Sequence, residues 1–551
     1  MRSRLRATLI LIAIAFSIAA VHGAAQNVST PPATSEGSFR IAGTVVSKVD
    51  GHPLANAEVA LASTKARQQP ILVLTSDDGK FEFTGIPEGK YSLNGAKRGF
   101  IPAGYDQHEQ FSTAIVTGAD LDTEHLVLKL DPYALITGRV LDEVGEPIRE
   151  AMVTVYRENH LDGVRQIQIN RGAQTNDLGE FEITDLAPGT YFLSAAAQPW
   201  YAVHPPSDIG HSAGFDPSLD VSYPMTYYGD VMDAESATAI SVHGGEHLQL
   251  DVHVSPVPSV HVIVHVPSTG DNQFPFPQFE QRGFDDSVPV QRFENRLIKP
   301  GTWEISGIPA GKYDFRLTGH QGVGTQISGV ELNGTTQELD ASTAEPMCSL
   351  KVSVSFEDVA PSGKSGNYGV TLLGRSSRTM PTRNLDSEGE AEFQNLVPGR
   401  YEIFVFGAGR RFSVARIIGE GATVSGHAVI LAAGASASLS VSAVKGTAEI
   451  QGVVKRSGKP FAGAFVVLVP GDPDGKRDLF RRDQSDLDGT FVFHDVAPGA
   501  YTAVAIENGW DLDWAQPDLI LPYAKRGVPI QVADKPAQHL SLSGPLEVQQ
   551  K

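Results

Sequence analysis

The chain has 551 residues and carries 64 acidic against 44 basic residues, a formal net charge of −20 at neutral pH. This charge repels phosphate backbones, so it argues against a nucleic-acid partner, and it favours a soluble monomer. Cys348 is the only cysteine, which excludes an intramolecular disulfide. At about 100–200 residues per domain, the length predicts several domains.

The N-terminus has the pattern of a secretory signal. Arg2, Arg4 and Arg6 precede the apolar run "ATLILIAIAFSIAAV", and small residues follow it. The run is shorter than the roughly 20 apolar residues that a spanning helix needs. We therefore expect a signal peptide over 1–24 and a flexible linker over 25–37. The mature protein is then secreted, periplasmic or at the cell surface, with no membrane span.

Five segments in the rest of the chain share one pattern: a glycine, alternating apolar residues, a second turn and a tyrosine. They are "DDGKFEFTGIPEGKYSL", "NDLGEFEITDLAPGTYFL", "KPGTWEISGIPAGKYDF", "SEGEAEFQNLVPGRYEI" and "DLDGTFVFHDVAPGAYTA". The leading glycines are Gly79, Gly179, Gly301, Gly389 and Gly489, and the closing tyrosines are Tyr91, Tyr191, Tyr313, Tyr401 and Tyr501. The alternation predicts a strand with one buried face, entered through a tight glycine turn and followed by a second strand.

A second pattern precedes the first in three of the five units. It reads "GTVVSKVDGHPLANAEVAL" from Gly43, "GRVLDEVGEPIREAMVTVY" from Gly138 and "GVVKRSGKPFAGAFVVLVP" from Gly452. In units three and four, "SVHVIVHV" and "SLKVSVSF" stand where the first strand is expected. Roughly seven short strands per unit, with turns between them, are typical of a β-sandwich.

We therefore predict an all-β fold, a tandem array of about five seven-stranded β-sandwich domains. Repeat 2 includes an aromatic-rich insertion over 199–230, and repeats 3 and 4 are divergent. Short junctions between the repeats predict a semi-rigid rod. The repeats span 38–131, 132–256, 257–345, 346–446 and 447–551.

The repeated segments resemble the carboxypeptidase regulatory-like domain, a transthyretin-like (prealbumin-like) β-sandwich. The combination of "G-x-F-x-F…L-x-P-G-x-Y" with an upstream "G-x-V…G-x-P-L" carries the resemblance, which is good for repeats 1, 2 and 5 and partial for repeats 3 and 4. The resemblance implies a non-catalytic accessory module, found beside peptidases, sugar-active enzymes and outer-membrane receptors. Related sandwiches bind starch or form adhesin stalks.

The stretch "SVHGGEHLQL" contains H-x-x-E-H, a spacing that some zinc peptidases use on a helix. Gly244 and Gly245 would each destabilise such a helix by about 1 kcal/mol relative to alanine, and the flanking residues alternate as strands do. Similar "EHLVL" and "QHLSL" segments occur in repeats 1 and 5 without a preceding histidine. We therefore interpret His243 to His247 as a turn, and expect no metal, no cofactor and no catalytic site.

The stretch "SDLDGTF" in repeat 5 is similar to the opening of a calcium loop, through Asp486 and Asp488. A calcium loop needs a bidentate glutamate near its twelfth position, and a buried type of strand follows here instead. Aspartate, asparagine and serine also favour β-turns, so we interpret the stretch as a turn.

Aromatic residues cluster in the loop after the tyrosine strand. In repeat 5 this loop reads "NGWDLDWAQPD", and in repeat 2 "QPWYAVHPPSD", extended by "VSYPMTYYGDVMD". Rings beside carboxylates can stack on sugars and accept hydroxyl hydrogen bonds, although large aromatics also cap sandwich ends or fill junctions. The candidate ligand-binding residues are Trp510, Asp511, Asp513, Trp514, Trp200, Tyr201, Tyr227 and Tyr228.

We expect an exported, non-catalytic binding or display protein whose end loops hold a carbohydrate or a surface protein partner. One alternative is a purely structural spacer or adhesin stalk, which predicts no ligand and buried aromatics. A second alternative is a regulatory partner of a separate peptidase. Fold alone does not decide among these functions.

Overall fold

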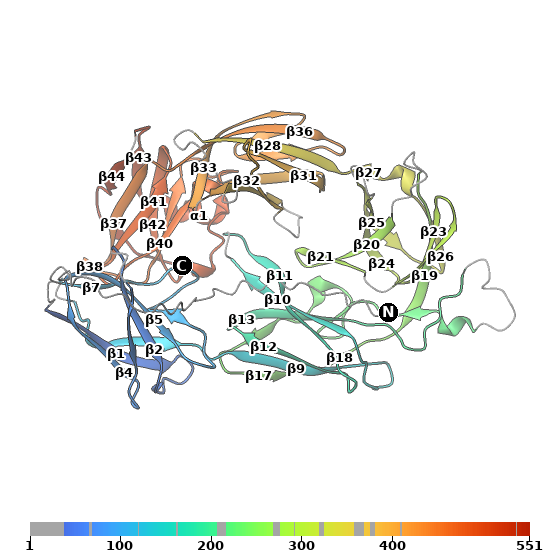
Figure 1. Ribbon diagram of the computed structural model, residues 1–551, viewed down its shortest axis with the longest axis horizontal. Coiled ribbons are helices and arrows are strands. Elements are labelled where there is room, and N and C mark those ends of the chain that lie inside the picture. The colour runs from blue at the N-terminus through green and yellow to red at the C-terminus, as the bar shows by residue number, and fades with distance from the viewer. Residues whose placement is uncertain are drawn as a thin grey trace, which may run out of the picture.

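The computed structural model describes residues 38–65, 69–118, 121–160, 163–206, 216–267, 276–290, 293–318, 324–356, 368–374, 381–407, 410–535 and 537–551. The predicted signal peptide and linker, 1–24 and 25–37, lie outside these residues. The described chain is built almost entirely of short strands, with one α-helix in repeat 5. These strands form successive two-layer sandwiches, so the predicted all-β tandem array is confirmed (Figure 1).

Repeat 1 shows the arrangement in its simplest form. One sheet has the order β4-β1-β8, and the other has the order β3-β2-β5 with β6 and β7 also pairing with β5. The strands are β1 (Phe39–Ser47), β2 (Glu58–Ser63), β3 (Ile71–Leu74), β4 (Lys80–Ile86), β5 (Gly89–Ala96), β6 (Ala103–Gly104), β7 (Ile115–Thr117) and β8 (Leu126–Leu130).

Repeat 2 has the same two sheets, β12-β9-β17 with β18, and β11-β10-β13-β15 with β16. Its elements are β9 (Ala134–Leu141), β10 (Met152–Asn159), β11 (Gln166–Gln174), β12 (Glu180–Leu186), β13 (Gly189–Ala196), η1 (Pro217–Leu219), β14 (Val221–Ser222), β15 (Thr226–Tyr227), η2 (Ala234–Ser236), β16 (Ile240–Val242), β17 (His247–Gln249) and β18 (Val252–His253). Strand β14 of the insertion pairs with the first strand of repeat 3 rather than with repeat 2.

Repeat 3 has two five-stranded sheets, β14-β19-β23-β22 with β26, and β21-β20-β24-β25-β27. Its elements are β19 (Val257–His265), β20 (Phe276–Gly283), β21 (Asp286–Pro289), β22 (Glu294–Lys299), β23 (Thr302–Pro309), β24 (Gly311–Thr318), β25 (Thr325–Leu332), β26 (Thr336–Asp340), η3 (Ala341–Thr343) and β27 (Glu345–Pro346).

In repeat 4 the long strand β33 pairs with both layers and joins them into one sheet, β30-β29-β32-β33-β36-β28-β31 with β34 and β35. Its strands are β28 (Cys348–Phe356), β29 (Tyr368–Gly374), β30 (Thr382–Asn384), β31 (Glu390–Leu396), β32 (Gly399–Gly407), β33 (Arg410–Glu420), β34 (Thr423–Ser425), β35 (Ala428–Leu431) and β36 (Ser436–Val444).

Repeat 5 has the sheets β38-β37-β41 with β44 and β45, and β40-β39-β42-β43 with β46. Its elements are β37 (Ala448–Arg456), β38 (Lys459–Pro460), β39 (Phe465–Pro470), η4 (Arg477–Leu479), β40 (Arg481–Gln484), β41 (Thr490–Val496), β42 (Gly499–Glu507), η5 (Gly509–Asp511), α1 (Pro517–Ala524), β43 (Val528–Val532), β44 (Gln538–Ser541), β45 (Leu546–Glu547) and β46 (Gln549–Gln550).

The repeated sequence pattern has the same structural role in every repeat. The turn glycines adopt positive φ, for example +75° at Gly79 and +76° at Gly489, which confirms the predicted tight turns. The strand after each glycine lies in one layer of the sandwich and the tyrosine strand lies in the other, so the proline turn carries the chain between the layers, which in repeat 4 belong to one continuous sheet. In all five repeats a residue with positive φ occurs near the end of the strand that follows the turn glycine: Gly85, Asp185, Gly307, Asn395 and Asp495.

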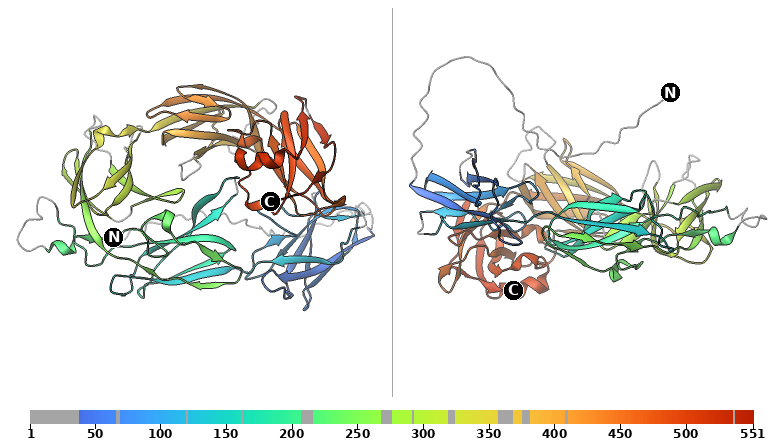
Figure 2. Two further views of the ribbon diagram at one scale, coloured as in Figure 1. Left: turned by 180° about the vertical axis from the view of Figure 1, so that it is seen from behind. Right: turned by 90° about the horizontal axis from the view of Figure 1, so that it is seen from below.

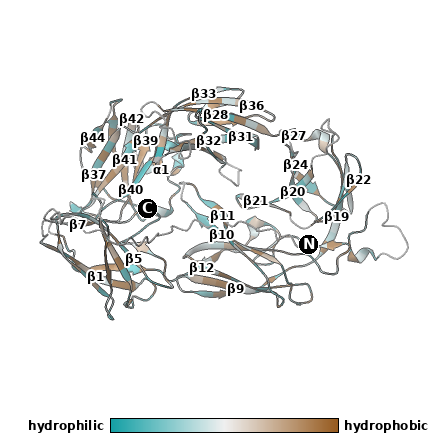
Figure 3. Ribbon diagram, viewed as in Figure 1, coloured by the Kyte–Doolittle hydropathy of each residue, from teal (hydrophilic) through white to brown (hydrophobic). Residues whose placement is uncertain are grey.

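Each sandwich has a hydrophobic core of its own, formed by the inward residues of both layers. Figure 3 shows hydrophobic residues along the strands, including β1 and β9. Because side chains alternate across a strand, each layer contributes one apolar face. Two further clusters lie outside these cores, one on the outer face of repeat 5 and one between repeats 2 and 3.

The predicted rod is wrong, because the array closes on itself. Figures 1 and 2 show the five sandwiches following one another around a loop that brings repeat 1 (blue) beside repeat 5 (red). Lys90 of repeat 1 forms an ion pair with Asp486 of repeat 5, and Ala515 of repeat 5 donates to the carbonyl of Gly163 in repeat 2 at 3.0 Å. The short junctions predicted that neighbouring repeats lie close together. They carried no information on the direction in which the chain bends at each junction.

Candidate functional site

The aromatic loop of repeat 5 lies in the junction that closes the ring. Trp514 is only 5% exposed and packs on the outer face of β39 and β42, against Phe480 at 5.5 Å between ring centroids. Trp510 is partly buried and stacks on His108 of repeat 1, with centroids 5.0 Å apart and an interplanar angle of 4°. The Trp510 ring therefore forms a contact between repeats 5 and 1.

The two aspartates of this loop also have partners. Asp513 accepts a hydrogen bond from His160 of repeat 2 at 2.8 Å, and Asp511 forms an exposed ion pair with Lys551 at 2.5 Å. A Cβ added at Gly163 would lie 2.6 Å from the Trp514 ring, so repeat 2 approaches that ring with backbone alone. Trp510, Trp514 and Asp513 thus join repeat 5 to repeats 1 and 2.

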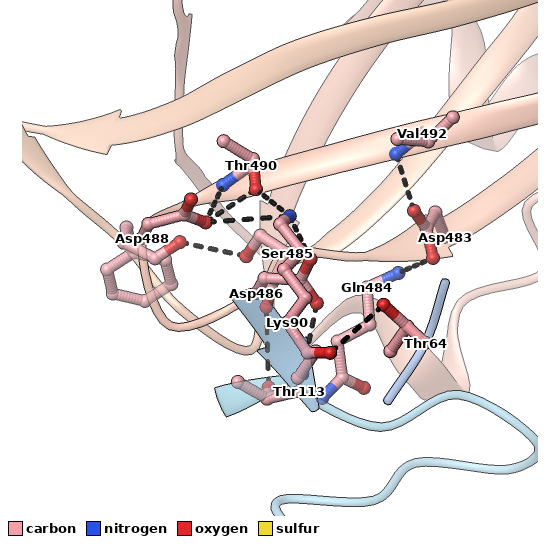
Figure 4. A network of polar contacts seen from close by, with 12 residues as sticks. Thr64, Lys90, Thr113, Asp483, Gln484, Ser485, Asp486, Asp488, Thr490 and Val492 are labelled. Carbon is pink, nitrogen blue, oxygen red and sulfur yellow. Dashed lines mark hydrogen bonds and ion pairs between the residues drawn. The ribbon is translucent and has the colours of Figure 1, made fainter. Parts of the chain in front are cut away.

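A polar network missed by the sequence analysis holds repeat 1 against repeat 5 (Figure 4). Lys90 Nζ lies 2.5 Å from Asp486 Oδ2, and Asp486 Oδ1 accepts from the Ala114 amide at 3.0 Å. The Leu487 amide donates to the Ala114 carbonyl at 3.1 Å. Burial raises the pKa of Asp486, and the hydrogen bond and charge of Lys90 act against that rise. The "SDLDGTF" stretch is the predicted turn, and it docks on repeat 1.

Tyr227 and Tyr228 face the interior. Tyr227 is fully buried between repeats 2 and 3, where its ring meets the Phe284 ring edge to face at 5.5 Å. Tyr228 packs against the core of repeat 2. These two rings are used in packing.

Trp200 and Tyr201, in contrast, lie at the surface at one end of repeat 2. Trp200 is 86% exposed, the largest exposed fraction among the exposed large hydrophobic residues of the described chain. Its ring meets the Tyr201 ring edge to face, with centroids 5.8 Å apart at 89°. Most of the indole surface of Trp200 is therefore in contact with solvent.

A carboxylate beside the two rings is held in place by two phenols. Glu143, in the turn between β9 and β10, accepts from Tyr201 Oη at 2.5 Å and from Tyr223 Oη at 2.9 Å. Partial burial alone would raise the pKa of Glu143, but the hydrogen bonds from Tyr201, its own backbone amide and Tyr223 outweigh it, and the pKa lies below the ordinary value. Burial and the neighbouring carboxylate raise the pKa of Tyr201 to about 12. At neutral pH the site therefore presents an anion fixed by two neutral phenols.

We call Trp200, Tyr201, Tyr223 and Glu143 the aromatic platform. The sequence analysis named its two exposed rings but not the carboxylate or the second phenol. Glu143 lies 58 residues before Tyr201 and 80 before Tyr223, and no local pattern links them. Val144, the next residue, is 74% exposed.

The H-x-x-E-H stretch is the predicted turn between β16 and β17. His243 is largely exposed, and Glu246 accepts from both the backbone amide and Nδ1 of His243, at 2.9 and 3.0 Å. His247 begins β17, which pairs in parallel with β9. Within the described ranges, no group of three or more histidine, cysteine or acidic residues has the geometry of a metal site.

A cavity of about 760 Å³ lies between repeats 4 and 5, lined by Val414, His427, Val444, Lys476, Tyr501 and neighbouring residues. His427 is bound to Asp478 at 2.6 Å and Lys476 to Asp472 at 2.7 Å, so these charges are already paired. Tyr501 differs from its four counterparts. Their hydroxyls donate to the carbonyl four residues earlier, whereas the buried Tyr501 hydroxyl has no partner in the described protein.

A buried chain of titratable groups connects the insertion of repeat 2 to repeat 3. Asp220 accepts from His204 at 2.8 Å and from His261 at 2.7 Å, and His261 also lies 3.3 Å from Glu304. The hydrogen bond to Asp220 raises the pKa of His261. Burial would raise the pKa of Asp220, but hydrogen bonds from the two histidines lower it to about 2. This series of hydrogen-bonded side chains connects the segment at β14 to β19.

Comparison with family models identifies two of the repeats. Residues 40–119 and 135–221 match the carboxypeptidase regulatory-like domain. Repeats 1 and 2 therefore each contain a segment similar to this domain, and the resemblance noted in the sequence is confirmed for them. No curated protein sequence is significantly similar to the chain.

Among the described residues, no helical segment has the length and hydrophobicity to span a lipid bilayer.

Several solved structures are similar to parts of the chain at low sequence identity. The TIE protein of Bacillus anthracis is 12% identical over 74% of each chain, with a TM-score of 0.18. The minor pilin GBS52 of Streptococcus agalactiae is 14% identical over 40% of this chain and 97% of its own, with a TM-score of 0.21. The shaft pilin SpaA of Lactobacillus rhamnosus GG is 9% identical over 40% and 97%, with a TM-score of 0.19. Similarity at this level carries no information on function.

Proposed function

We propose that the protein is an exported, non-catalytic binding protein whose aromatic platform holds the face of a sugar ring in a polysaccharide. The observation that carries this proposal is the 86% exposed indole of Trp200 beside an anchored carboxylate. The apolar face of a pyranose fits an exposed indole, and its hydroxyl groups are donors for a carboxylate.

The geometry around Trp200 supports a sugar better than a purely apolar ligand. Glu143 uses one oxygen for each phenol and also accepts from its own backbone amide, which leaves about one of the roughly four lone-pair sites of the carboxylate for a sugar hydroxyl. Tyr201 stands at 89° to Trp200, so the two rings form a corner rather than a flat surface. A corner of this kind can hold one ring on its face and its hydroxyl groups at its edge.

The closed ring supports a binding role over that of a spacer. A spacer gains length from an extended chain, whereas repeats 1 and 5 of this chain are in contact. The packed rings of Trp510 and Trp514 agree with one expectation of the spacer hypothesis, but Trp200 does not. The hypothesis of a peptidase partner has no specific support in the described residues.

Affinity electrophoresis in gels that contain soluble polysaccharides tests the proposal. At least one polysaccharide should retard the wild-type protein, and Trp200→Ala should remove most of that retardation. Glu143→Gln should weaken it, because an amide accepts fewer hydrogen bonds than a carboxylate. Leu178→Ala is a matched control, since Leu178 is 62% exposed on a turn of the same repeat and should not affect binding. Equal retardation of wild type and Trp200→Ala, or no retardation by any polysaccharide, would refute the proposal.

A further inference from the structure

The open edge of the second sheet of repeat 1 is unlike the same edge in other repeats. Strands β3, β11, β21, β30 and β40 occupy equivalent outermost positions in their sheets. Strand β3 has the sequence Ile-Leu-Val-Leu, with Ile71, Leu72 and Leu74 exposed by 52%, 57% and 66%. Strand β30 has Thr-Arg-Asn, and β40 has Arg-Arg-Asp-Gln. Proteins normally protect sheet edges with charged residues, and β3 has none.

Two of the equivalent edges are already used for docking within this chain. In repeat 2, the Ile167 amide of β11 donates to Asp285 of repeat 3 at 2.6 Å. In repeat 5, Gln484 of β40 donates to the Asp106 carbonyl of repeat 1 at 2.6 Å. This edge is thus a docking element of the repeat. Within the described residues, β3 pairs only with β2 and has no strand on its other side.

The hydrogen bonds at the end of β3 show which backbone groups point outward. The Thr75 amide donates to Ala57, and the Thr75 carbonyl accepts from Asn56, so both groups of Thr75 point toward β2. In an antiparallel pair this direction alternates along the strand. The amide and carbonyl groups of Leu72 and Leu74 therefore point to the open edge, in register for an added strand.

We propose that the β3 edge binds an extended segment of a partner protein, which adds a strand with alternating apolar residues and a basic residue beside the Leu74 end. Backbone hydrogen bonds supply affinity in such strand addition, and alternate side chains supply specificity. On the outer face of the sheet, the added apolar residues contact Leu72 and Leu74. Glu58 lies opposite Leu74 in the register, and Asp77 is exposed three residues beyond, which sets the preference for a cation.

A second copy of the chain fits this edge less well. The net charge of −20 opposes self-association. A symmetric contact through four residues also buries far less than the roughly 1,200 Å² of a stable interface. A basic extended segment avoids the charge repulsion, because its charge is complementary to that of the chain.

Three synthetic peptides test the proposal on the full mature protein. The first alternates valine and threonine between terminal lysines, the second has terminal glutamates, and the third has the lysines with N-methyl groups on alternate backbone amides. Binding is followed by fluorescence anisotropy, and hydrogen exchange reports the amides of Leu72 and Leu74. The lysine peptide should bind saturably and slow exchange at both amides. The other two should bind at least tenfold more weakly.

Protein variants locate the contact. Leu72→Pro removes one outward amide and leaves the ladder to β2 intact, since proline is tolerated at a sheet edge when its nitrogen faces outward. It should weaken binding of the lysine peptide at least tenfold, and so should Leu72→Lys combined with Leu74→Lys. Trp200→Ala should leave peptide binding unchanged, which separates this result from failure of the sugar proposal. Absence of saturable binding, equal binding of the N-methylated peptide, or dimerisation of the chain through β3 would overturn the proposal.

Discussion

The closure of the ring can be tested through Lys90, whose ammonium group crosses from repeat 1 to repeat 5. Lys90 is 25% and Asp486 17% exposed, so this ion pair is far less solvated than one at the surface. Lys90→Met keeps most of the aliphatic stem and leaves Asp486 buried without its cation. Breaking a fully buried pair in this way costs about 3–5 kcal/mol, and partial exposure reduces our expectation to about 2 kcal/mol. That corresponds to about a 30-fold change in the closed-to-open ratio.

Amide hydrogen exchange measures this ratio at the junction itself. The Ala114 amide is bound to Asp486, and the Leu487 amide to the Ala114 carbonyl, so both exchange when the two repeats separate. We expect both amides to exchange about 30-fold faster in Lys90→Met than in wild type. Lys80→Met is the matched control, because Lys80 pairs with Asp78 at an exposed site and should not affect either amide. Unchanged exchange in Lys90→Met, or equal acceleration in both variants, would contradict our account of the junction.

Two other predictions concern single repeats and one junction. Tyr401→Phe should destabilise the protein by about 1 kcal/mol because it removes a buried hydrogen bond, whereas Tyr501→Phe should be neutral or stabilising. Thermal unfolding of the two variants measures the difference, and equal losses of stability would contradict the structure. The raised pKa of His261 means that its protonation stabilises the junction of repeats 2 and 3 fully below pH about 6.5, and that this contribution is lost as pH rises through the folded-state pKa. Asp220→Asn should flatten this dependence in hydrogen exchange of β14, and an unchanged pH profile in the variant would show that another group is responsible.

The strands and turns could be predicted from the sequence because their signals are local. The alternation of Phe81 and Phe83 defines a buried face, and Gly79 defines the turn before it. The same reasoning correctly assigned His243 to a turn, since the glycines beside it disfavour a helix.

The closed ring could not be predicted, because its contacts join distant parts of the chain. Lys90 and Asp486 are separated by 396 residues, and neither belongs to a sequence pattern that predicts contact with the other. Each junction sets an angle, and the sum of those angles decides between a rod and a ring. These angles depend on side-chain packing between neighbouring repeats. The alternation of apolar residues and the positions of turn residues do not predict that packing.

The aromatic loops show the same limit at the level of single residues. Trp200 and Trp514 both lie in the loop that follows the tyrosine strand of their repeat, and the sequence makes both of them candidates. Repeat 2 covers Trp514 through Gly163, whereas the described chain leaves Trp200 exposed. The local pattern therefore identified where rings gather, and the arrangement of the repeats decided which ring reaches solvent.

The most direct test of the central claim is iodide quenching of tryptophan fluorescence with and without a soluble polysaccharide. The chain has four tryptophans, of which Trp200 is 86% exposed and Trp514 only 5%, so quenching reports mainly on Trp200. Our account predicts that a bound polysaccharide shields this ring and reduces quenching in a saturable way. It also predicts that Trp200→Phe abolishes most quenching in the free protein. Quenching that no polysaccharide reduces would contradict a sugar-binding platform at Trp200.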